Sequence, residues 1–241
     1  QHIEGCLIPG CPILHVQYGG LAISNSPFPF RAHHMTTEID YYFAGSSPFT
    51  YLGHKAICDV AKRHGVQLNF KPVDPMGVWE KSGSVPLPQR SKLRQRYRFV
   101  ELQRIAALRN LQINLQPAHF PVDPTLADCC TIVIQRAGDE PSAYMEQVFS
   151  SVWTQELDIL DPKVVGGLLT ACGFDAEAVI EEAQSSTIRE QRARNTGEAA
   201  NADAVGVPAF VLNGEVFWGQ DRIEFIDHAL KTGRLPFHAP E

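Results

Sequence analysis

The sequence predicts an α/β protein in which a block of helices separates a βαβ unit from a ββα unit. Three observations support this fold class: a strand–helix–strand pattern, a long middle segment rich in helix-forming residues, and a hairpin followed by an amphipathic helix. The predicted order along the chain is therefore βαβ, helices, then ββα.

The first unit lies within residues 39–72. Residues 39–43 (IDYYF) are aromatic and β-branched, which is typical of a buried strand. Residues 51–64 place apolar side chains four apart, as on one helix face, and Gly65 is a stop signal. Residues 66–72 (VQLNFKP) alternate apolar and polar and predict a second strand. Because a single helix joins the two strands, we expect them to be parallel with a right-handed crossover.

The middle of the chain, roughly residues 76–192, is expected to be helical. Residues 142–153 (SAYMEQVFSSVW) place Tyr144, Val148 and either Ser151 or Val152 on one face. Strong helix formers or helix-start signals mark three further segments: 90–110, 162–172 and 175–184.

The end of the chain returns to β structure. Residues 208–212 (PAFVL) predict a strand, Asn213-Gly214 is a strong hairpin signal, and residues 215–218 (EVFW) predict the returning strand. Residues 221–230 predict a closing amphipathic helix that stops near Gly233.

This order of elements is that of a thioredoxin-like fold with an inserted all-helical domain. We assign residues 37–75 and 195–237 to the thioredoxin-like domain and residues 76–194 to the insertion. Residues 1–34 show neither helical nor strand periodicity and precede Met35, the first methionine. We expect them to be a leader or an extension outside the fold.

Composition excludes several classes of protein. The formal net charge of −6 argues against a nucleic-acid binder, and no stretch reaches the roughly 18 apolar residues that a membrane helix needs. The six cysteines include no CxxC pair, which removes the usual redox dithiol and the paired-thiolate zinc site. Isolated thiols in a chain of this length indicate a reducing compartment, so we expect a cytoplasmic protein without a metal.

Ser47-Pro48-Phe49 lies where the first strand turns into the first helix. Unpaired N–H groups and the helix dipole at such a start stabilise a thiolate. No cysteine is present at this corner, so a ligand would have to bring the sulfur, to which the Ser47 hydroxyl could donate a hydrogen bond. The alternative is that Ser47 only caps the helix, with Pro48 at its first position.

Gly206-Val207-Pro208 directly precedes the third predicted strand. In the thioredoxin pattern this proline is cis, which exposes the backbone N–H and C=O of the preceding residue. These two groups could pair with a peptide-like ligand as an added strand would. On its own the tripeptide is also compatible with an ordinary turn.

Four segments together resemble the 2-hydroxychromene-2-carboxylate isomerase family, which is similar to kappa-class glutathione transferases and more distantly to DsbA-type oxidoreductases. They are residues 39–53 (IDYYFAGSSPFTYLG), 98–104 (RFVELQR), 206–210 (GVPAF) and 217–223 (FWGQDRI). The resemblance spans about residues 37–237 and is carried by the combination of SPF, GVP and FWGQDR in this order. The chain departs from the family pattern at Ala44, where the family often has aspartate, and at Ala209, where it usually has threonine or serine.

The resemblance implies glutathione as the cofactor and a role for each matching residue. Ser47 matches the thiolate-binding serine, Val207 the residue that pairs with the cysteinyl backbone, and Pro208 the cis-proline. Gln220 and Asp221 match the end that holds the γ-glutamyl group. A carboxylate suits a cationic amine there, although Asp221 near a helix start is also a candidate N-cap.

The basic run between residues 90 and 98 has two interpretations. It is either a solvated helix face or a clamp in which one or two side chains hold a carboxylate, from glutathione or from an acidic substrate. We include Arg94 in the clamp, and Tyr97 as a substrate contact that could equally pack. Trp79 and Trp218 are candidates for an aromatic substrate pocket, whereas we expect Trp153 to pack in the core. The members of the run are Arg90, Lys92, Arg94, Arg96 and Arg98.

Together these residues predict a glutathione-dependent isomerase. The expected reaction is cis–trans isomerisation of a small aromatic carboxylate resembling 2-hydroxychromene-2-carboxylate, by reversible thiolate addition. Two alternatives stay open: a kappa-like transferase that conjugates electrophiles, and a non-catalytic thioredoxin-like protein that binds peptides. The missing CxxC disfavours a disulfide oxidoreductase, and relatives imply a homodimer.

Overall fold

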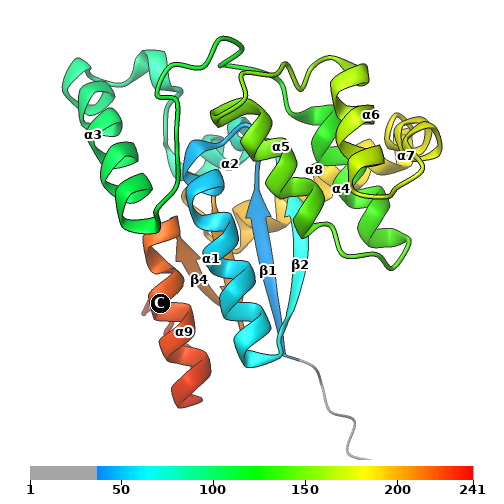
Figure 1. Cartoon of the computed structure of the whole chain (residues 1–241). Helices are drawn as coiled ribbons and strands as arrows, with labels where there is room; N and C mark the ends of the chain where they lie inside the picture. Colours follow the sequence, from blue (N-terminus) through cyan, green and yellow to red (C-terminus); the bar gives the residue numbers. More distant parts are fainter. Residues whose placement is uncertain (1–36, 241) are drawn as a thin grey trace, which may run out of the picture. The chain divides into compact units, whose positions relative to one another are not determined.

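A four-stranded mixed sheet in the order β2-β1-β3-β4 organises the computed structural model, which describes residues 37–240 (Figure 1). Its strands are β1 (Glu38–Phe43), β2 (Gln67–Pro72), β3 (Ala209–Leu212) and β4 (Glu215–Trp218). β1 pairs parallel with β2 and antiparallel with β3, and β3 pairs antiparallel with β4. The predicted strands, the parallel pair and the hairpin are confirmed; the predicted extension, residues 1–34, lies outside the described residues.

Helix α1 (Pro48–His64) makes the crossover between the parallel strands. It begins three residues earlier than its apolar pattern predicted, because Ser47 caps it and Pro48 occupies its first turn. It ends at Gly65, whose φ of 64° is a left-handed conformation that glycine adopts without steric cost. The β3–β4 turn likewise has positive φ at Asn213 and Gly214, as a type I′ hairpin requires.

Helices fill the chain between β2 and β3. They are α2 (Pro75–Ser82), α3 (Lys92–Arg109), α4 (Thr125–Arg136), α5 (Ser142–Trp153), α6 (Pro162–Ala171), α7 (Ala176–Ala183) and α8 (Ser186–Asn201), with a short 3₁₀ turn η1 (Leu87–Gln89). The predicted helix 142–153 coincides with α5, and Tyr144, Val148, Ser151 and Val152 are all buried. α8 runs through the proposed boundary at residue 194, and the division into two domains stays a prediction.

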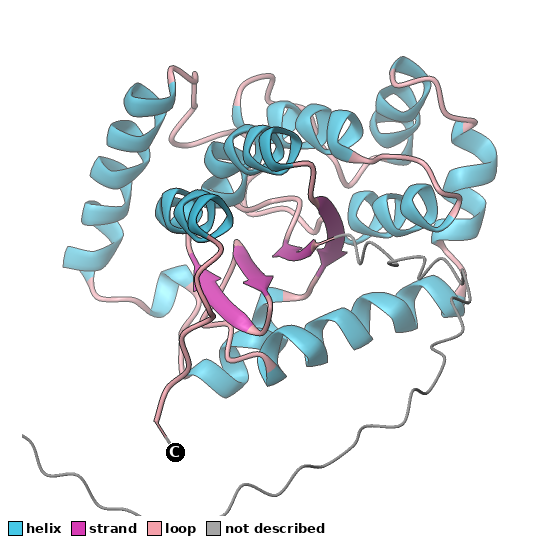
Figure 2. Ribbon diagram, turned by 90° about the horizontal axis from the view of Figure 1, so that it is seen from below, coloured by secondary structure: helices cyan, strands magenta, loops and turns pink. Residues whose placement is uncertain are grey.

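The sheet lies between two helical layers (Figure 2). α1 and the closing helix α9 (Ile223–Thr232) pack on one face, while α8 crosses the other together with α2. A 3₁₀ turn, η2 (Gln220–Arg222), precedes α9, so this helix starts two residues later than predicted. Side chains alternate accordingly along β1: Tyr42 belongs to the small cluster beneath α2 and α8, and Tyr41 and Phe43 face the large core.

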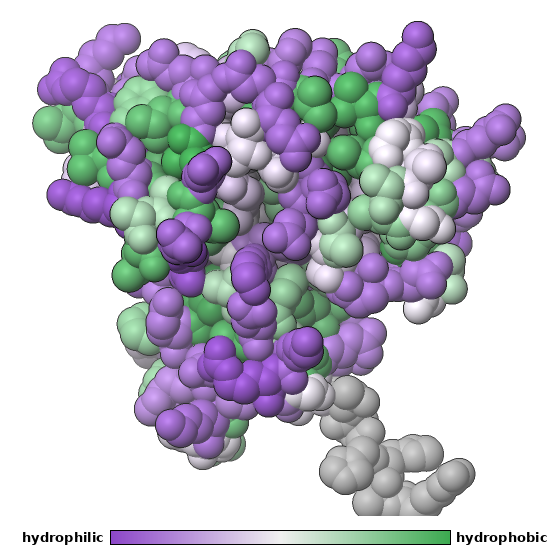
Figure 3. Space-filling model, in the orientation of Figure 1, coloured by the Kyte–Doolittle hydropathy of each residue, from purple (hydrophilic) through white to green (hydrophobic). Residues whose placement is uncertain are grey.

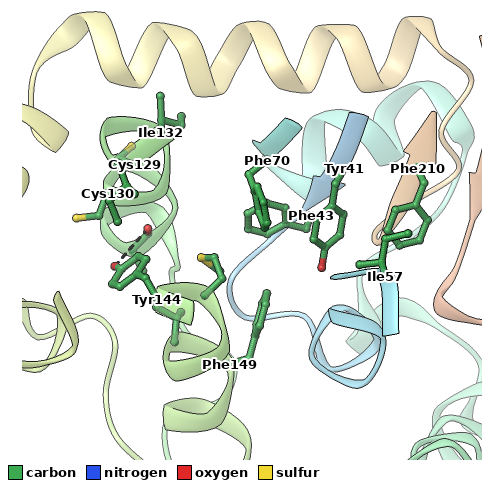
Figure 4. Close-up of a cluster of buried hydrophobic side chains, with 14 of the residues drawn as sticks. Tyr41, Phe43, Ile57, Phe70, Cys129, Cys130, Ile132, Tyr144, Phe149 and Phe210 are labelled. Carbon is green, nitrogen blue, oxygen red and sulfur yellow. Dashed lines mark hydrogen bonds between the residues drawn. The ribbon is translucent and has the colours of Figure 1, made fainter. Parts of the chain in front are cut away.

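The large core continues from the sheet into the helical block (Figure 4). The rings of Tyr41 and Phe210 lie 5.1 Å apart, and Phe43 meets Phe149 of α5 edge to face at 6.2 Å. Sheet and helices therefore share one packed interior, which holds the carboxyl end of β1 rigidly against the helical block. Within the described range, no helix combines the length and apolarity needed to cross a membrane.

Candidate active site

Two segments that are far apart in sequence meet at one end of the sheet. β1 ends at Phe43. Val207-Pro208 leads into the antiparallel strand β3, and the first residue of β3, Ala209, pairs with Tyr42 of β1. The 44–47 loop and the start of α1 therefore stand at the same edge of the sheet as Val207-Pro208, at the arrowhead end of β1 in Figure 1.

Ser47 is half-buried at this corner and caps α1. Its Oγ accepts a hydrogen bond from Thr50 N at 3.2 Å, which is the capping role that the sequence allowed. Among residues 37–240 the hydroxyl proton has no acceptor, and the N–H of Phe49 has none either. The corner therefore presents two hydrogen-bond donors beside a helix N-terminus, an arrangement that suits an anion.

The Val207–Pro208 peptide bond is cis, as expected. Pro208 C=O accepts a hydrogen bond from Gly219 N at 2.8 Å, which ties this corner to the residues before η2. In the described part of the chain, neither the N–H nor the C=O of Val207 has a hydrogen-bond partner. Val207 is half-buried and therefore offers one donor and one acceptor to an extended ligand.

Two tryptophans from different elements converge on Gly206. A Cβ built at Gly206 would lie 3.1 Å from Nε1 of Trp218 in β4 and 3.3 Å from Nε1 of Trp79 in α2. Both are tight contacts, so glycine is needed for the two indoles to approach the backbone this closely. Trp79 and Trp218 thus flank the Val207 corner, whereas Trp153 is fully buried in the core as expected.

The basic run divides into exposed and partly buried side chains. Arg94 and Tyr97 are exposed. The guanidinium of Arg90 lies 5.5 Å from the Trp79 ring, and that of Arg98 lies 5.6 Å from the Phe120 ring. Neither guanidinium forms an ion pair with a carboxylate of residues 37–240.

The electrostatics of this basic cluster favour an added anion. Burial, and then the nearby charge of Arg90, lower the pKa of Arg98 to about 10. Burial and the charge of Arg94 likewise lower the pKa of Arg90. The sequence singled out Arg94 rather than Arg98 for the clamp, because Phe120 lies 22 residues beyond Arg98 and no local pattern joins the two.

Gln220 and Asp221 differ in their surroundings. Gln220 is buried, and its Oε1 and backbone C=O each accept a hydrogen bond from Arg109 of α3, at 3.0 Å. Its Cβ also lies only 2.7 Å from a Cβ built at Gly53. Asp221 is 59% exposed and pairs with Arg222 at 2.8 Å, and its side chain caps no helix, so the N-cap alternative is wrong.

The 44–50 corner itself contains no cysteine, and the thiols of the described region are held in their protonated form. Burial raises the pKa of Cys58 to about 12, that of Cys130 to about 12 and that of Cys129 to about 11, while Cys172 is raised as well. Figure 4 shows Cys129 and Cys130 on α4, within the core. Such thiols are poor nucleophiles, so a thiolate at Ser47 would have to come from a ligand. Residues 37–240 contain no cluster of three or more potential metal-ligating side chains.

The family assignment rests on a match over nearly the whole described region. The family model for the DsbA-like thioredoxin domain matches residues 38–231. The chain belongs to this family. The matched region includes both the Ser47 corner and the cis Val207–Pro208 peptide bond.

Several relatives share one name. The chain is 26% identical over 198 residues to a 2-hydroxychromene-2-carboxylate isomerase of Sphingobium xenophagum, covering 81% of this chain and 99% of the relative. It is 29% identical over 204 residues to one from Pseudomonas putida, covering 82% and 95%. A solved 2-hydroxychromene-2-carboxylate isomerase superposes with a TM-score of 0.70 at 24% identity, covering 81% and 95%, which supports the fold.

Proposed function

We propose that this DsbA-like domain is a glutathione-dependent isomerase that interconverts the cis and trans forms of an aromatic 2-hydroxychromene-2-carboxylate-like substrate. The observation that carries the proposal is the Ser47 corner. Within residues 37–240, the Ser47 hydroxyl proton has no acceptor and the Val207 backbone has no partner, and the two stand at the same edge of the sheet at the start of α1. Relatives named as isomerases, covering about four-fifths of the chain, support the reaction class.

The residues at the corner fit a cysteine-containing tripeptide. Ser47 would donate its hydroxyl proton to the ligand's sulfur anion, aided by the N–H of Phe49 and the helix dipole. Val207 would pair with the cysteinyl backbone through its N–H and C=O. Asp221 would bind the γ-glutamyl amine. When bound, glutathione would supply a nucleophile that adds reversibly to an electron-poor double bond, so that rotation can precede elimination.

The substrate's carboxylate is assigned to a basic cluster formed by Arg98 and Arg94 of α3 and by Arg90 just before it. Arg98 is a partly buried guanidinium without a carboxylate partner in the described residues. Arg90 adds like charge beside it, and Arg94 adds like charge beside Arg90. A carboxylate would relieve that repulsion and accept charge-assisted hydrogen bonds. The indoles of Trp79 and Trp218 around Gly206 offer flat apolar surface for an aromatic ring, and the Trp79 indole lies beside Arg90 of this cluster.

The quaternary state and the cellular location belong to the same proposal. We propose a cytoplasmic homodimer, since the buried thiols suit a reducing compartment. Apolar side chains of α3 interrupt the hydrophilic surface at the upper left of Figure 3. Leu93 is 70%, Tyr97 56% and Leu108 80% exposed, and a second copy would cover them. Light scattering of the purified chain should give twice the monomer mass, and the monomer mass would contradict this.

Substitution of Ser47 tests the proposed activity. We expect Ser47→Ala to lower kcat/KM for 2-hydroxychromene-2-carboxylate by roughly 10- to 100-fold, because one hydrogen bond to a charged group contributes about 1.5–3 kcal/mol. Release of unmodified glutathione in each turnover separates isomerisation from conjugation.

Two controls isolate the hydroxyl's chemical role from its capping role. Ser46→Ala changes the adjacent serine of the same corner, and Ser185→Ala removes the equivalent cap of α8, where Ser185 Oγ accepts from Ile188 N. Both controls should keep near-wild-type turnover. Turnover by Ser47→Ala equal to that of Ser185→Ala would refute the proposal.

A further inference from the structure

A buried ion pair stands directly behind the proposed glutathione corner. Asp128 of α4 is fully buried and accepts hydrogen bonds from Nε and Nη2 of Arg192 in α8, at 3.1 and 2.9 Å. Its other oxygen, Oδ1, accepts a hydrogen bond from Gly45 N at 2.9 Å. Gly45 lies two residues before Ser47, so this hydrogen bond from Gly45 N to Asp128 fixes the 44–47 loop to the helical block.

Arg192 also bonds to the backbone that follows the second strand, β2. Its Nη2 also donates to Val73 C=O at 2.9 Å, and Val73 N donates to Phe43 C=O at 2.8 Å. The same two side chains therefore hold the backbone that follows β1 and the backbone that follows β2. These are the two parallel strands whose carboxyl ends frame the site.

The sequence of the loop is adapted to this contact. A Cβ built at Gly45 would lie 2.9 Å from Asp128 Oδ1, 3.3 Å from Pro124 Cβ and 3.5 Å from a methyl group of Val148. A side chain at this position would therefore push the loop away from the carboxylate. One residue earlier, Ala44 C=O accepts from Ser47 N at 3.0 Å, so a shift of the loop would pass directly to Ser47.

A buried ion pair is a costly means of holding a fold together. Removing two charges from water is costly, and well-packed apolar residues of similar volume often stabilise a fold as much or more. Burial raises the pKa of Asp128 to about 6, against the opposing effects of Arg192 and Gly45 N–H, so the carboxylate is ionised at neutral pH. What the pair adds beyond packing is a directed acceptor for one backbone amide.

We propose that Asp128, oriented by Arg192, is a positioning residue that fixes the 44–47 loop and thereby aims the Ser47 hydroxyl and the first-turn amides of α1 at the ligand's sulfur. The inference rests on the proposed function, since the ligand is the glutathione assigned there. In this account the helical block, through α4 and α8, sets the geometry of the loop that follows β1.

The experiment measures the thiol pKa and the dissociation constant of bound glutathione from the ultraviolet thiolate absorbance against pH. We expect Asp128→Ala to raise the bound thiol pKa by roughly half a unit or more and to weaken glutathione binding roughly tenfold. Asp128→Asn keeps an acceptor for Gly45 N and should stay closer to wild type. Thr131→Val is the matched control, because Thr131 is fully buried on the same helix and, among residues 37–240, its hydroxyl bonds to Ala127 and Met145 alone.

Gly45→Ala approaches the same contact from the loop side and keeps Asp128 and Arg192 intact, so it remains informative if Asp128→Ala does not fold. We expect it to raise the bound thiol pKa as Asp128→Ala does. The effects of the two substitutions should be less than additive in the double variant. Amide hydrogen exchange of residues 45–47 should speed up in both single variants and stay unchanged in Thr131→Val.

The outcomes separate the two claims. If wild type shows no bound thiolate, the proposed function fails, and the positioning role fails with it. If wild type binds glutathione as thiolate and Asp128→Ala and Gly45→Ala leave its pKa unchanged, the positioning role alone is overturned. An equal shift in Thr131→Val would also overturn it, because the effect would then be general destabilisation.

Discussion

Replacing Gly53 by alanine should destabilise the protein, although alanine is the better helix former. Gly53 lies inside α1, where alanine would normally gain about 1 kcal/mol. The added Cβ would meet Gln220 Cβ at 2.7 Å, Ile223 Cδ1 at 3.3 Å and Gln220 Cα at 3.4 Å. Because two of these atoms belong to the backbone or its first side-chain carbon, a rotamer change cannot relieve the contact.

The magnitude follows from the balance of these two effects. Overpacking costs about 1–3 kcal/mol, and here the cost falls at the upper end because η2 must move and disturb the hydrogen bonds between Gln220 and Arg109. We expect a net loss of about 1–2 kcal/mol in the free energy of unfolding. The KM for glutathione should rise as well, since Gln220 and Asp221 belong to the displaced turn.

Guanidinium unfolding of two matched variants provides the comparison. Gly167 in α6 and Gly197 in α8 are also helical and exposed, and a Cβ at either meets nothing within 4 Å. Gly167→Ala and Gly197→Ala should therefore stabilise the protein by about 0.5–1 kcal/mol without changing KM. The reasoning is refuted if Gly53→Ala is as stable as these variants.

Two further predictions concern charge. Arg98→Gln should raise the KM for the carboxylate substrate roughly tenfold or more with little change in kcat. The control, Arg96→Gln, changes an exposed residue of α3 and should leave KM unchanged. Equal KM values for the two variants would contradict the role of Arg98. Burial lowers the pKa of His54 to about 4, so the unfolded chain takes up the proton first as the pH falls. Stability should thus drop by about 2 kcal/mol between pH 7 and 5 through His54 alone. We expect His54→Phe to lose this pH-dependent part of the free energy of unfolding when its urea unfolding is compared with that of wild type between pH 7 and 5. The comparison cancels the contributions of other titrating groups, such as Asp128. Identical dependence of stability on pH in the two proteins would contradict the role of His54.

Local sequence signals were sufficient for the elements that build the sheet and for the proposed corner. The aromatic run of β1, the Asn213-Gly214 turn and the capping Ser47 each act within a few residues, and the structure has all three. The sequence did not predict α8 as a separate helix, because few apolar residues mark its buried face. Instead, its polar side chains at Arg192 and Asn195 bond to the backbone at the end of β2.

Contacts over long sequence separations carry the rest of the site, and no local pattern reports them. Arg109 and Gln220 are 111 residues apart, and Gly45 and Asp128 are 83 apart. Gln220 and Asp221 looked equivalent in the sequence, yet one is buried under Arg109 and the other is exposed. Only the packing of α3 against α1 and of α4 against β2 decides which polar side chains become fixed supports and which stay available to a ligand.

Titration of the wild-type protein with glutathione at neutral pH, followed in the ultraviolet thiolate band, tests the central claim most directly. A free thiol has a pKa of about 8.5 and is mostly protonated at this pH. We expect a saturable rise in thiolate absorbance as glutathione binds against Ser47 and the start of α1. Binding without that rise, or no binding at all, would contradict the claim that this corner holds a sulfur anion.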